Sequence, residues 1–418
     1  MKKLLYLLAL IPITFFLASC DDSSSDGSSS AGWTDREADP DCSPDSLTCW
    51  HDIPLVWNAP YNWQLPLQQN EYFNATLPGT LLDSGGGATT SILKTDLDYT
   101  AIATDPEATI HFWDGSQAPR FQDPWFKYAD IIENLKISYL DAKGRLIETR
   151  ADVYALIESQ DSGHECCTDS DRNIGFNLIR VDRSIDAPPI RDPAIQCEGD
   201  DCMYSILGEQ NTYTIKATEA TFQPTYISVV RTNSSDSAPD EYFARLYTKL
   251  DESDYTWLGA SANDGQFASV AIQVNGAPLD IDSTYIDNPP VLDTGGGPFQ
   301  LRGTGDDSFK SSTFIANNPN VTVTHVDDGC GGQGSCQSVS ITTDNSIEVS
   351  LTDAAGATYS FAMGPYKDDP DSINNVITID NAGGAVTNTG VPAYVENEIV
   401  IDSSTQRIGF KSYPARTP

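Results

Sequence analysis

The sequence predicts a mostly β protein, and three observations lead to that prediction. Short runs in which apolar and polar residues alternate recur along the chain, as in "ASVAIQVNGAPLDI". Hairpin turn signals interrupt such runs at Asn275-Gly276, at Asp141–Gly144 and near Asp353–Gly356. Helical periodicity is scarce, and "PWFKYADIIENL" is the stretch in which we expect a helical turn or two.

The first twenty residues predict a leader that is removed. "MKKLLYLLALIPITFFLASC" begins with Lys2 and Lys3, continues with the apolar stretch Leu4–Leu17, and ends in Leu-Ala-Ser-Cys at Cys20. This segment resembles a bacterial lipoprotein signal, and a plain secretory signal is the alternative. We therefore expect residues 1–19 to be cleaved and Cys20 to carry the lipid. That lipid would anchor the protein to a bacterial membrane outside the cytoplasm, in the periplasm or at the cell surface.

The composition is strongly acidic and limits the classes of partner. Asp and Glu number 60 against 24 Lys and Arg, and the formal net charge is −36. Such a surface repels nucleic acid, so no nucleic-acid partner is expected. Residues 20–52 are rich in Ser and Asp and predict a disordered tether. The remaining length predicts two lobes, residues 53–250 and 251–418, in a monomer.

The chain has nine cysteines, which leaves eight if Cys20 is lipidated. An even number in an oxidising compartment predicts disulfides, although the sequence does not fix which cysteines pair. "HECC" at His164–Cys167 has no second ligand pair with zinc spacing, so we expect no metal there. The disulfide candidates are Cys42 with Cys49, Cys197 with Cys202, Cys330 with Cys336, and the adjacent Cys166 and Cys167.

Two segments share a pattern that predicts chemistry. In "LPGTLLDSGGGATT" and "NPPVLDTGGGPFQL", an apolar pair leads to Asp83 or Asp293, followed by Ser or Thr and three glycines. Two carboxylates within hydrogen-bond reach share a proton, and such a pair can activate water while protonating a carbonyl oxygen. The glycines leave room for substrate and for the facing backbone. The hydroxyls of Ser84 and Thr294 can anchor the facing loop.

These segments resemble the active-site motifs of the pepsin-like, bilobed aspartic proteases, which carry one Asp-Thr/Ser-Gly motif per lobe. "RNIGFNLI", with Gly175, resembles the segment that closes the catalytic loop of the first lobe. "NTGVPAYVENEIVIDSSTQRIGF", with Gly390, resembles the family's C-terminal stretch. The resemblance extends from about Trp57 to the C-terminus. It implies a double-β-barrel acid protease fold with lobes related by a pseudo-two-fold axis.

The resemblance also implies an activity and a set of site residues. Asp83 and Asp293 would be the catalytic dyad of an aspartic endopeptidase that hydrolyses an extended peptide or protein substrate without a metal or organic cofactor. The hairpin "LKISYLDAKGRLIETR" falls where the family has its flap, so Tyr139 matches the tyrosine that closes over the substrate. The residues expected to support the paired loops are Ser84, Gly85, Thr294 and Gly295.

The sequence departs from the family pattern at three positions. Gly86 and Gly296 stand where the family usually has Ser or Thr, three residues after each aspartate. Losing those hydroxyl donors is expected to raise the pKa of the carboxyl groups, and so to shift activity toward milder pH or to weaken it. Leu140 follows Tyr139 where the family prefers Gly, which leaves Tyr128 as the alternative flap tyrosine.

Other interpretations remain. The main alternative is a catalytically impaired protein of the same fold that binds peptide or glycan at the cell surface, and another is a structural lipoprotein without a site. Asp83 and Asp293 could also be ordinary turn residues. A phosphate-binding loop is disfavoured because no Lys-Ser/Thr follows the glycines. The scattered histidines predict no catalytic constellation, and acidic loops such as Asp251–Asp254 lack a calcium-loop pattern.

Overall fold

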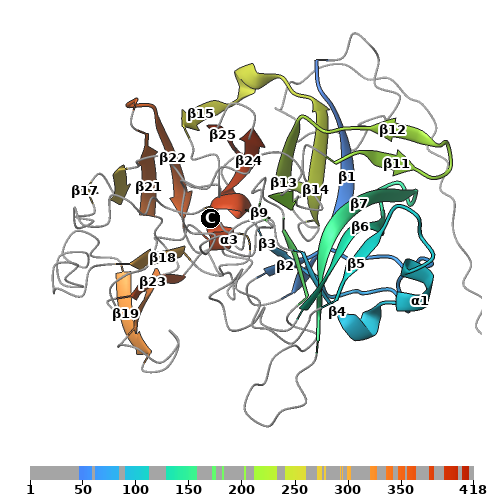
Figure 1. Cartoon of the computed structure of the whole chain (residues 1–418). Helices are drawn as coiled ribbons and strands as arrows, with labels where there is room; N and C mark the ends of the chain where they lie inside the picture. The colour runs from blue at the N-terminus through green and yellow to red at the C-terminus, as the bar shows by residue number, and fades with distance from the viewer. Residues whose placement is uncertain are drawn as a thin grey trace, which may run out of the picture. The chain divides into compact units, whose positions relative to one another are not determined.

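Figure 1 presents the computed structural model of the chain. It describes residues 47–58, 62–83, 90–112, 129–157, 172–175, 181–182, 202–203, 211–232, 241–259, 271–274, 277–278, 292, 294, 299–302, 321–326, 336–341, 347–353, 355–363, 376–380, 390–402 and 407–413. All of them lie in the compact unit that spans Arg36–Pro418.

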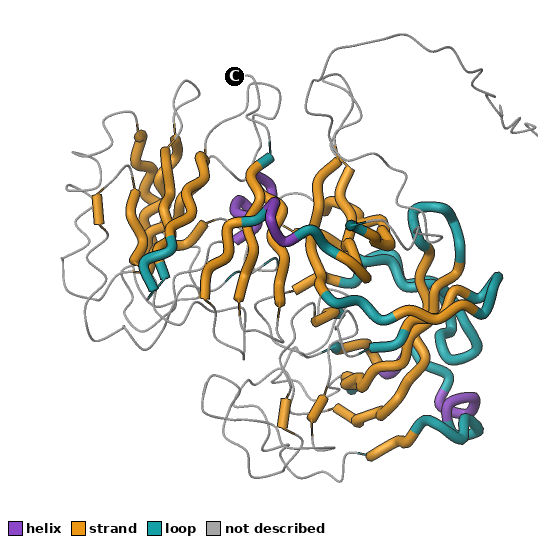
Figure 2. Tube along the Cα trace, turned by 90° about the horizontal axis from the view of Figure 1, so that it is seen from above, coloured by secondary structure: helices purple, strands orange, loops and turns teal. Residues whose placement is uncertain are grey.

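The described part of the chain is mostly β-strand, as Figure 2 shows. Its α-helices are α1 (Tyr99–Ile102) and α3 (Gly390–Glu396), and single 3₁₀ turns occur at Lys94–Asp96 and Glu252–Asp254. The predicted fold class, mostly β, is therefore confirmed. Within these residues, no helix has both the length and the apolar character needed to cross a membrane.

One sheet contains fifteen strands, including both the first strand (β1) and the last strand (β25) of the described chain. Its order is β12-β11-β7-β4-β8-β3-β2-β1-β14-β13-β24-β25-β15, with β6 paired to β7 and β5 paired to β6. β13 pairs with β24, so a strand from residues 53–250 lies beside one from residues 251–418. The strands are β1 (Cys49–Asn58), β2 (Asn62–Gln64), β3 (Leu81–Asp83), β4 (Ser91–Leu93), β5 (Thr109–His111), β6 (Ala129–Leu140), β7 (Leu146–Leu156), β8 (Asn173–Gly175), β11 (Tyr213–Ile215), β12 (Ala220–Phe222), β13 (Tyr226–Thr232), β14 (Glu241–Lys249), β15 (Thr256–Gly259), β24 (Asn397–Asp402) and β25 (Arg407–Ser412).

Two four-stranded sheets come from the C-terminal half. The first has the order β17-β16-β21-β22, and the second has the order β18-β23-β20-β19 with β18 and β23 parallel. A separate two-stranded ribbon pairs β9 (Val181–Asp182) with β10 (Cys202–Met203). The strands of the four-stranded sheets are β16 (Ala271–Val274), β17 (Ala277–Pro278), β18 (Phe299–Arg302), β19 (Val321–Val326), β20 (Cys336–Ile341), β21 (Ile347–Thr352), β22 (Thr358–Met363) and β23 (Val376–Asp380).

The three predicted hairpins are confirmed. β16 and β17 pair antiparallel with Val274 opposite Ala277, which leaves a two-residue connection. β21 pairs with β22, and β6 pairs with β7, across the other two predicted turns. Gly356 and Gly144 adopt φ angles of 87° and 73° in those turns. Glycine tolerates this left-handed region because it has no Cβ atom.

The helical turn predicted within "PWFKYADIIENL" is wrong for the described part of that stretch. Residues 129–140 form β6, which pairs with β7 and fully buries Ile132, Leu135 and Ile137. A bulge at Asn134, with φ of 56°, interrupts the strand's alternation and made it resemble a helical pattern. The backbone N–H of Asn134 donates to Oδ1 of Asp152 on β7 at 3.0 Å, which holds the bulge in place.

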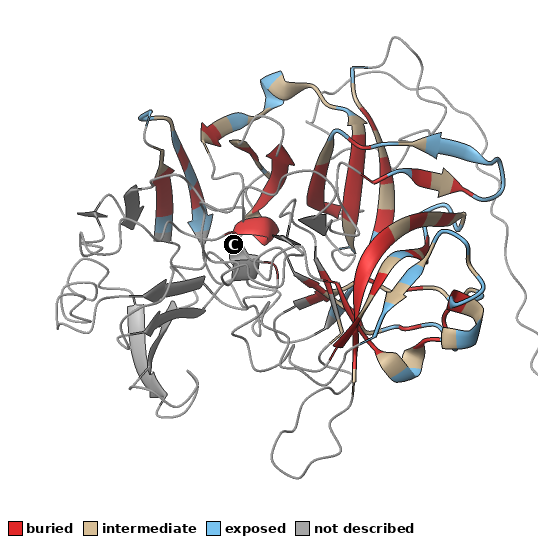
Figure 3. Ribbon diagram, viewed as in Figure 1, coloured by how far each residue is buried: buried red, intermediate tan, exposed pale blue. Residues whose placement is uncertain are grey.

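The apolar core includes Leu82 of β3, and β24 and residues 393–395 of α3 are also buried (Figure 3). Leu82, Ile92, Val153 and Ile174, which lie on β3, β4, β7 and β8, each expose none of their surface. Burial of a Leu, Ile or Val side chain contributes on the order of 1.5–3 kcal/mol. The strand that ends at Asp83 is therefore supported by apolar packing from its neighbours.

Polar contacts join the sheet of β21 and β22 to the fifteen-stranded sheet. The hydroxyl group of Tyr359 on β22 hydrogen-bonds the side chain of Asn397 and lies 2.5 Å from Oγ of Ser412. The backbone N–H of Gly259 on β15 donates to Oδ2 of Asp353 at 2.9 Å. This bond is the largest cause of the lowered pKa of the Asp353 carboxyl. The two sheets are thus held together by buried and half-buried hydrogen bonds.

Candidate active site

Asp83 is the last residue of β3, a strand with neighbours on both sides. β2 pairs with it antiparallel and β8 pairs with it parallel. The register places Leu82 opposite Ile174 and Asp83 opposite Gly175. Gly175 is the glycine that the sequence singled out as part of a loop-closing segment, and it lies directly beside Asp83. The two neighbouring strands fix the direction in which the chain leaves Asp83.

An ion pair holds β8 in this position. Arg172, one residue before β8, donates through Nε and Nη2 to Asp96 at 2.7 and 2.8 Å. Both side chains are about nine-tenths buried, and the backbone carbonyl of Arg172 accepts from the N–H of Leu81 at 3.0 Å. A bidentate pair of this kind fixes geometry as well as charge. It ties the start of β8 to the 3₁₀ turn that follows β4.

Thr294 connects the second aspartate motif to the first. Its side chain is fully buried, and its Oγ1 donates a hydrogen bond of 2.8 Å to the backbone carbonyl oxygen of Leu82. Leu292, on the other side of Asp293, is also fully buried. Thr294 follows Asp293 in the chain, and Leu82 precedes Asp83. The structure therefore brings together the residues next to the two predicted catalytic aspartates.

The C-terminal motif forms a helix followed by two strands. Gly390 begins α3, and the strands that follow it are β24 and β25, which pair antiparallel. α3 contacts β13, β18, β22 and β24, so that it links the large sheet to both smaller sheets. The side chain of Asn397 donates to the carbonyl oxygen of Ala393 at 2.8 Å and joins the end of α3 to β24. β18, one of the strands that α3 contacts, follows the Asp293 motif in the chain.

Several predicted site residues lie outside the described residues. The side chain of Asp83 is among them, although its backbone is part of β3. The others are Cys20, Ser84, Gly85, Gly86, Tyr128, Asp293, Gly295 and Gly296.

The placement of Tyr139 corrects the predicted role of this residue. Tyr139 lies near the end of β6, but its side chain is fully buried and its ring lies 6.4 Å from that of Tyr213. Burial raises the pKa of its phenol well above the ordinary value. The hairpin turn is fixed to β1, because the N–H of Ala142 donates to the carbonyl oxygen of Asp52 at 2.8 Å. Tyr139 is thus a core residue and does not face an open cleft.

The described residues bear on the disulfide and metal predictions only in part. Cys49 is 5 % exposed and forms a disulfide. Cys202 and Cys336 lie on β10 and β20, and the remaining candidates, Cys42, Cys166, Cys167, Cys197 and Cys330, lie outside the described residues. The predicted pairings stay predictions. Among the described residues, no group of three or more His, Cys, Asp or Glu is arranged to hold a metal ion.

Sequence reasoning missed two features. Thr80 precedes β3 and Thr90 precedes β4, and both hydroxyl groups are buried with no hydrogen-bond partner among the described residues. Both threonines lie inside the quoted motif "LPGTLLDSGGGATT", which was the signal that could have found them. The second feature is a pocket along β1, which combines residues from distant parts of the sequence.

Comparison with known proteins gives no family. No protein-family model matches the chain, and no curated protein sequence matches it.

Proposed function

We propose that the protein is an aspartic endopeptidase with a pepsin-like, bilobed double-β-barrel fold. The observation that carries the proposal is the hydrogen bond from Thr294 Oγ1 to the carbonyl oxygen of Leu82. It joins two copies of the same motif through Leu82 and Thr294, residues 212 positions apart that flank Asp83 and Asp293. Two ordinary turn aspartates would have no reason to be joined in this way. The parallel pairing of Asp83 with Gly175 supports the same proposal.

The proposed mechanism uses the two carboxyl groups as a coupled pair. Close carboxylates do not both ionise easily, so one keeps a proton at a pH where an isolated aspartate has lost it. The ionised carboxylate takes a proton from water, which attacks the scissile carbonyl carbon, while the protonated carboxyl donates to the carbonyl oxygen. Ser84, Gly85, Thr294 and Gly295 support the paired loops. No metal or organic cofactor takes part.

The proposed substrate is a peptide or protein segment in an extended conformation. An extended chain offers backbone hydrogen-bonding groups on both sides, which a β-rich site can pair. We further propose that lipid on Cys20 anchors the enzyme to a bacterial membrane outside the cytoplasm. The strongly acidic composition, with a net charge of −36, is consistent with an enzyme that does not act on nucleic acid.

Cleavage of a denatured protein mixture between about pH 3 and pH 7, which spans the ordinary carboxyl pKa and values raised above it, tests the proposal. The full chain in detergent is compared with Asp83→Asn, with Asp293→Asn, and with the wild type plus pepstatin, a transition-state mimic of this family. Asp254→Asn is the matched control, because Asp254 is exposed and pairs with Lys411 on the surface. We expect cleavage by the wild type and the control, and its loss in the other three samples.

Folded wild-type protein that cleaves nothing in this range would contradict the proposal. That result would favour the alternative, a binding protein with an impaired dyad. Cleavage that persists in both aspartate variants would instead assign the activity to another site.

A further inference from the structure

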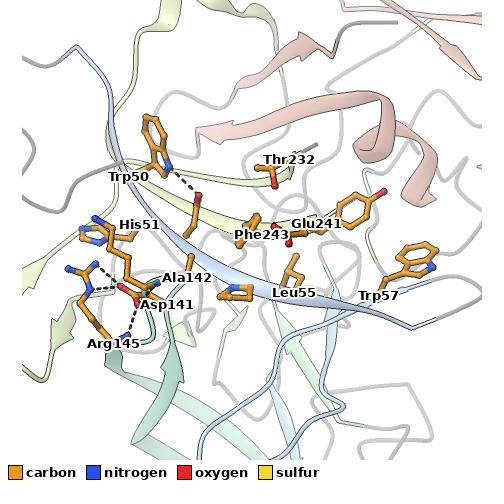
Figure 4. Close-up of a pocket in the computed structure, with 14 residues that line it drawn as sticks. Trp50, His51, Leu55, Trp57, Asp141, Ala142, Arg145, Thr232, Glu241 and Phe243 are labelled. Carbon is orange, nitrogen blue, oxygen red and sulfur yellow. Dashed lines mark hydrogen bonds and ion pairs between the residues drawn. The ribbon is translucent and has the colours of Figure 1, made fainter. Parts of the chain in front are cut away.

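A pocket of about 500 Å³ lies along β1, on residues that the proposed active site does not use. In Figure 4 its lining side chains follow β1 from Trp50 at one end to Trp57 at the other. The neighbouring walls come from β14, from Thr232 at the end of β13, and from the turn between β6 and β7. The seven residue steps from Trp50 to Trp57 span roughly 23 Å in an extended strand, so the pocket is longer than a single sugar or amino acid.

Aromatic rings form the apolar part of this pocket. Trp57 is 38 % exposed, and its ring stacks on Tyr242 with a centroid distance of 6.1 Å and an angle of 29°. The edge of Trp63 holds Trp57 from a second direction, with the centroids 5.7 Å apart. Phe243 lies beside Tyr242 on β14 and also lines the pocket. A large ring that is exposed on one face and packed against other rings offers a flat surface to a ligand. Because neighbouring rings already restrict it, little side-chain entropy is lost on binding.

Two residues that line the pocket each carry a buried polar atom without a hydrogen-bond partner among the described residues. These atoms are Nδ1 of His51, a residue that is 5 % exposed, and Oγ1 of Thr232, a residue that is 7 % exposed. A buried polar atom without a partner costs free energy, which a ligand that supplies the partner recovers. Burial lowers the pKa of His51 to about 4, so the imidazole is neutral at neutral pH. Both atoms are suited to neutral hydroxyl groups of a ligand.

The charges around the pocket balance. Asp52 is bound by two nitrogens of Arg245, and Asp141 is bound by Arg145 at 2.6 Å. Glu241 and Lys143, which also line the pocket, have opposite charges. The lining has three acidic and two basic side chains, and Arg245, which pairs with Asp52, brings the count to three of each sign, whereas the whole chain carries a net charge of −36. It therefore does not select an anion or a cation.

The backbone of β1 does not offer an edge to an extended peptide at this pocket. The carbonyl oxygen of Asp52 already accepts a hydrogen bond from the N–H of Ala142 in the hairpin turn. Pro54 has no N–H to donate. A peptide would need a continuous row of such groups to pair as an added strand. A ligand here must be held by side chains.

We propose that this pocket binds a neutral saccharide of about four rings, a length that the span from Trp57 to His51 requires. The C–H face of one ring would lie on Trp57, and hydroxyl groups would hydrogen-bond His51 Nδ1 and Thr232 Oγ1. Saccharides combine apolar ring faces with neutral hydroxyl groups, which is the combination that this lining presents. The proposal does not depend on Asp83 or Asp293.

Saturation-transfer NMR and tryptophan fluorescence titrations test the proposal. The full chain is studied in a detergent without a sugar headgroup, with the tetrasaccharides cellotetraose, maltotetraose, xylotetraose and N,N′,N″,N‴-tetraacetylchitotetraose as probes. We expect at least one probe to bind. Trp57→Ala should weaken that binding by at least about tenfold, and Thr232→Val, which removes only the hydroxyl group, by about 2- to 10-fold. Phe112→Ala, which removes an exposed ring outside the pocket, and Asp83→Asn should leave it unchanged.

The outcomes separate the saccharide from other ligands. Glucosamine and glucuronate, which carry one charge each, should bind no more tightly than the neutral probes. Failure of all four neutral probes to bind the folded protein would overturn the proposal. So would equal binding by the wild type and Thr232→Val, a variant chosen because it nearly preserves the volume of the side chain. A peptide that changes the tryptophan fluorescence of the wild type but not of Trp57→Ala, when the sugars change neither, would assign the pocket to peptide binding.

Discussion

Thr294 donates a 2.8 Å hydrogen bond from its side chain to the backbone carbonyl oxygen of Leu82. Both residues are fully buried, so neither group has water as an alternative partner. The bond joins the segment that contains Asp293 to the strand that ends at Asp83. It is the contact on which the relation between the two motifs depends.

Replacing Thr294 with Val should destabilise the protein and disable the proposed dyad. The Leu82 carbonyl would stay buried without its donor, which costs about 1–3 kcal/mol in the free energy of unfolding. Urea denaturation measures that loss, and the protein-cleavage assay measures the loss of activity. Thr294→Ser keeps the hydroxyl group and should retain most of both properties. If the Val variant were as stable and as active as the wild type, the bond would contribute neither to the free energy of unfolding nor to the proposed activity.

The ion pair between Asp52 and Arg245 predicts a larger effect on stability. Arg245 is 1 % exposed, and its guanidinium lies over Trp50 at 4.4 Å as well as against Asp52. Asp52→Ala would leave a buried cation without its carboxylate, which costs about 3–5 kcal/mol. The control is Asp254→Ala, which breaks an exposed pair with Lys411 and should cost less than about 1 kcal/mol. Equal urea midpoints for the two variants would contradict this account.

The sequence predicted local features of the fold well and long-range features poorly. Turn chemistry at Gly144, Gly356 and Asn275-Gly276 was sufficient to predict three hairpins, because such turns are determined by adjacent residues. The start of β6, residues 129–135, was mistaken for part of a helical turn because the bulge at Asn134 breaks its alternation. Pairing with β7, a tertiary interaction, overrides that local pattern.

In the candidate site, too, the features that adjacent residues determine were predicted and those that depend on tertiary contacts were not. The repeated motif predicted that the hydroxyl group of Thr294 anchors the facing segment, and its hydrogen bond to Leu82 agrees with that prediction. Tyr139 was misjudged, since its distance from a hairpin turn does not reveal which face of the strand is buried. The pocket beside β1 could not be predicted, because His51, Thr232 and Tyr242 meet only through the pairing of β1, β14 and β13.

Gly409 in the C-terminal motif has a packing role that mutation can test. A Cβ atom at this position would lie 2.9 Å from Cζ3 of Trp257, whose ring is packed under Arg407 at 4.1 Å. Gly409→Ala should therefore shift Trp257 and destabilise the protein by about 1–3 kcal/mol. Gly79→Ala is the control, because its Cβ would meet only the flexible end of Gln64 at 3.4 Å. An equal effect of both substitutions on the urea midpoint would rule out the clash with Trp257 as the cause.

Stability should fall as the pH decreases from about 6.5 to about 4, because His51 is buried in its neutral form. Burial and then Arg145 lower its pKa from 6.5 to about 4, so the unfolded chain binds a proton more readily in this window. The stabilisation is complete above pH 6.5 and is lost through the folded pKa, to a total of about 3 kcal/mol. The other charged groups near the ring are Asp141, Asp52 and Lys143. Urea midpoints across this range should vary less in His51→Gln, and an unchanged slope would exclude His51 as the titrating group.

The last prediction rests on the proposed protease activity and concerns Gly86 and Gly296. A hydroxyl group three residues after each aspartate would donate to the ionised carboxylate and lower its pKa. Gly86→Ser and Gly296→Ser should therefore move the acidic limb of the pH–rate profile toward lower pH. Ala88→Ser adds a hydroxyl group two residues further along the chain and should leave the profile in place. A shift toward higher pH, or an equal shift in the Ala88 variant, would show that the glycines do not set the pH range.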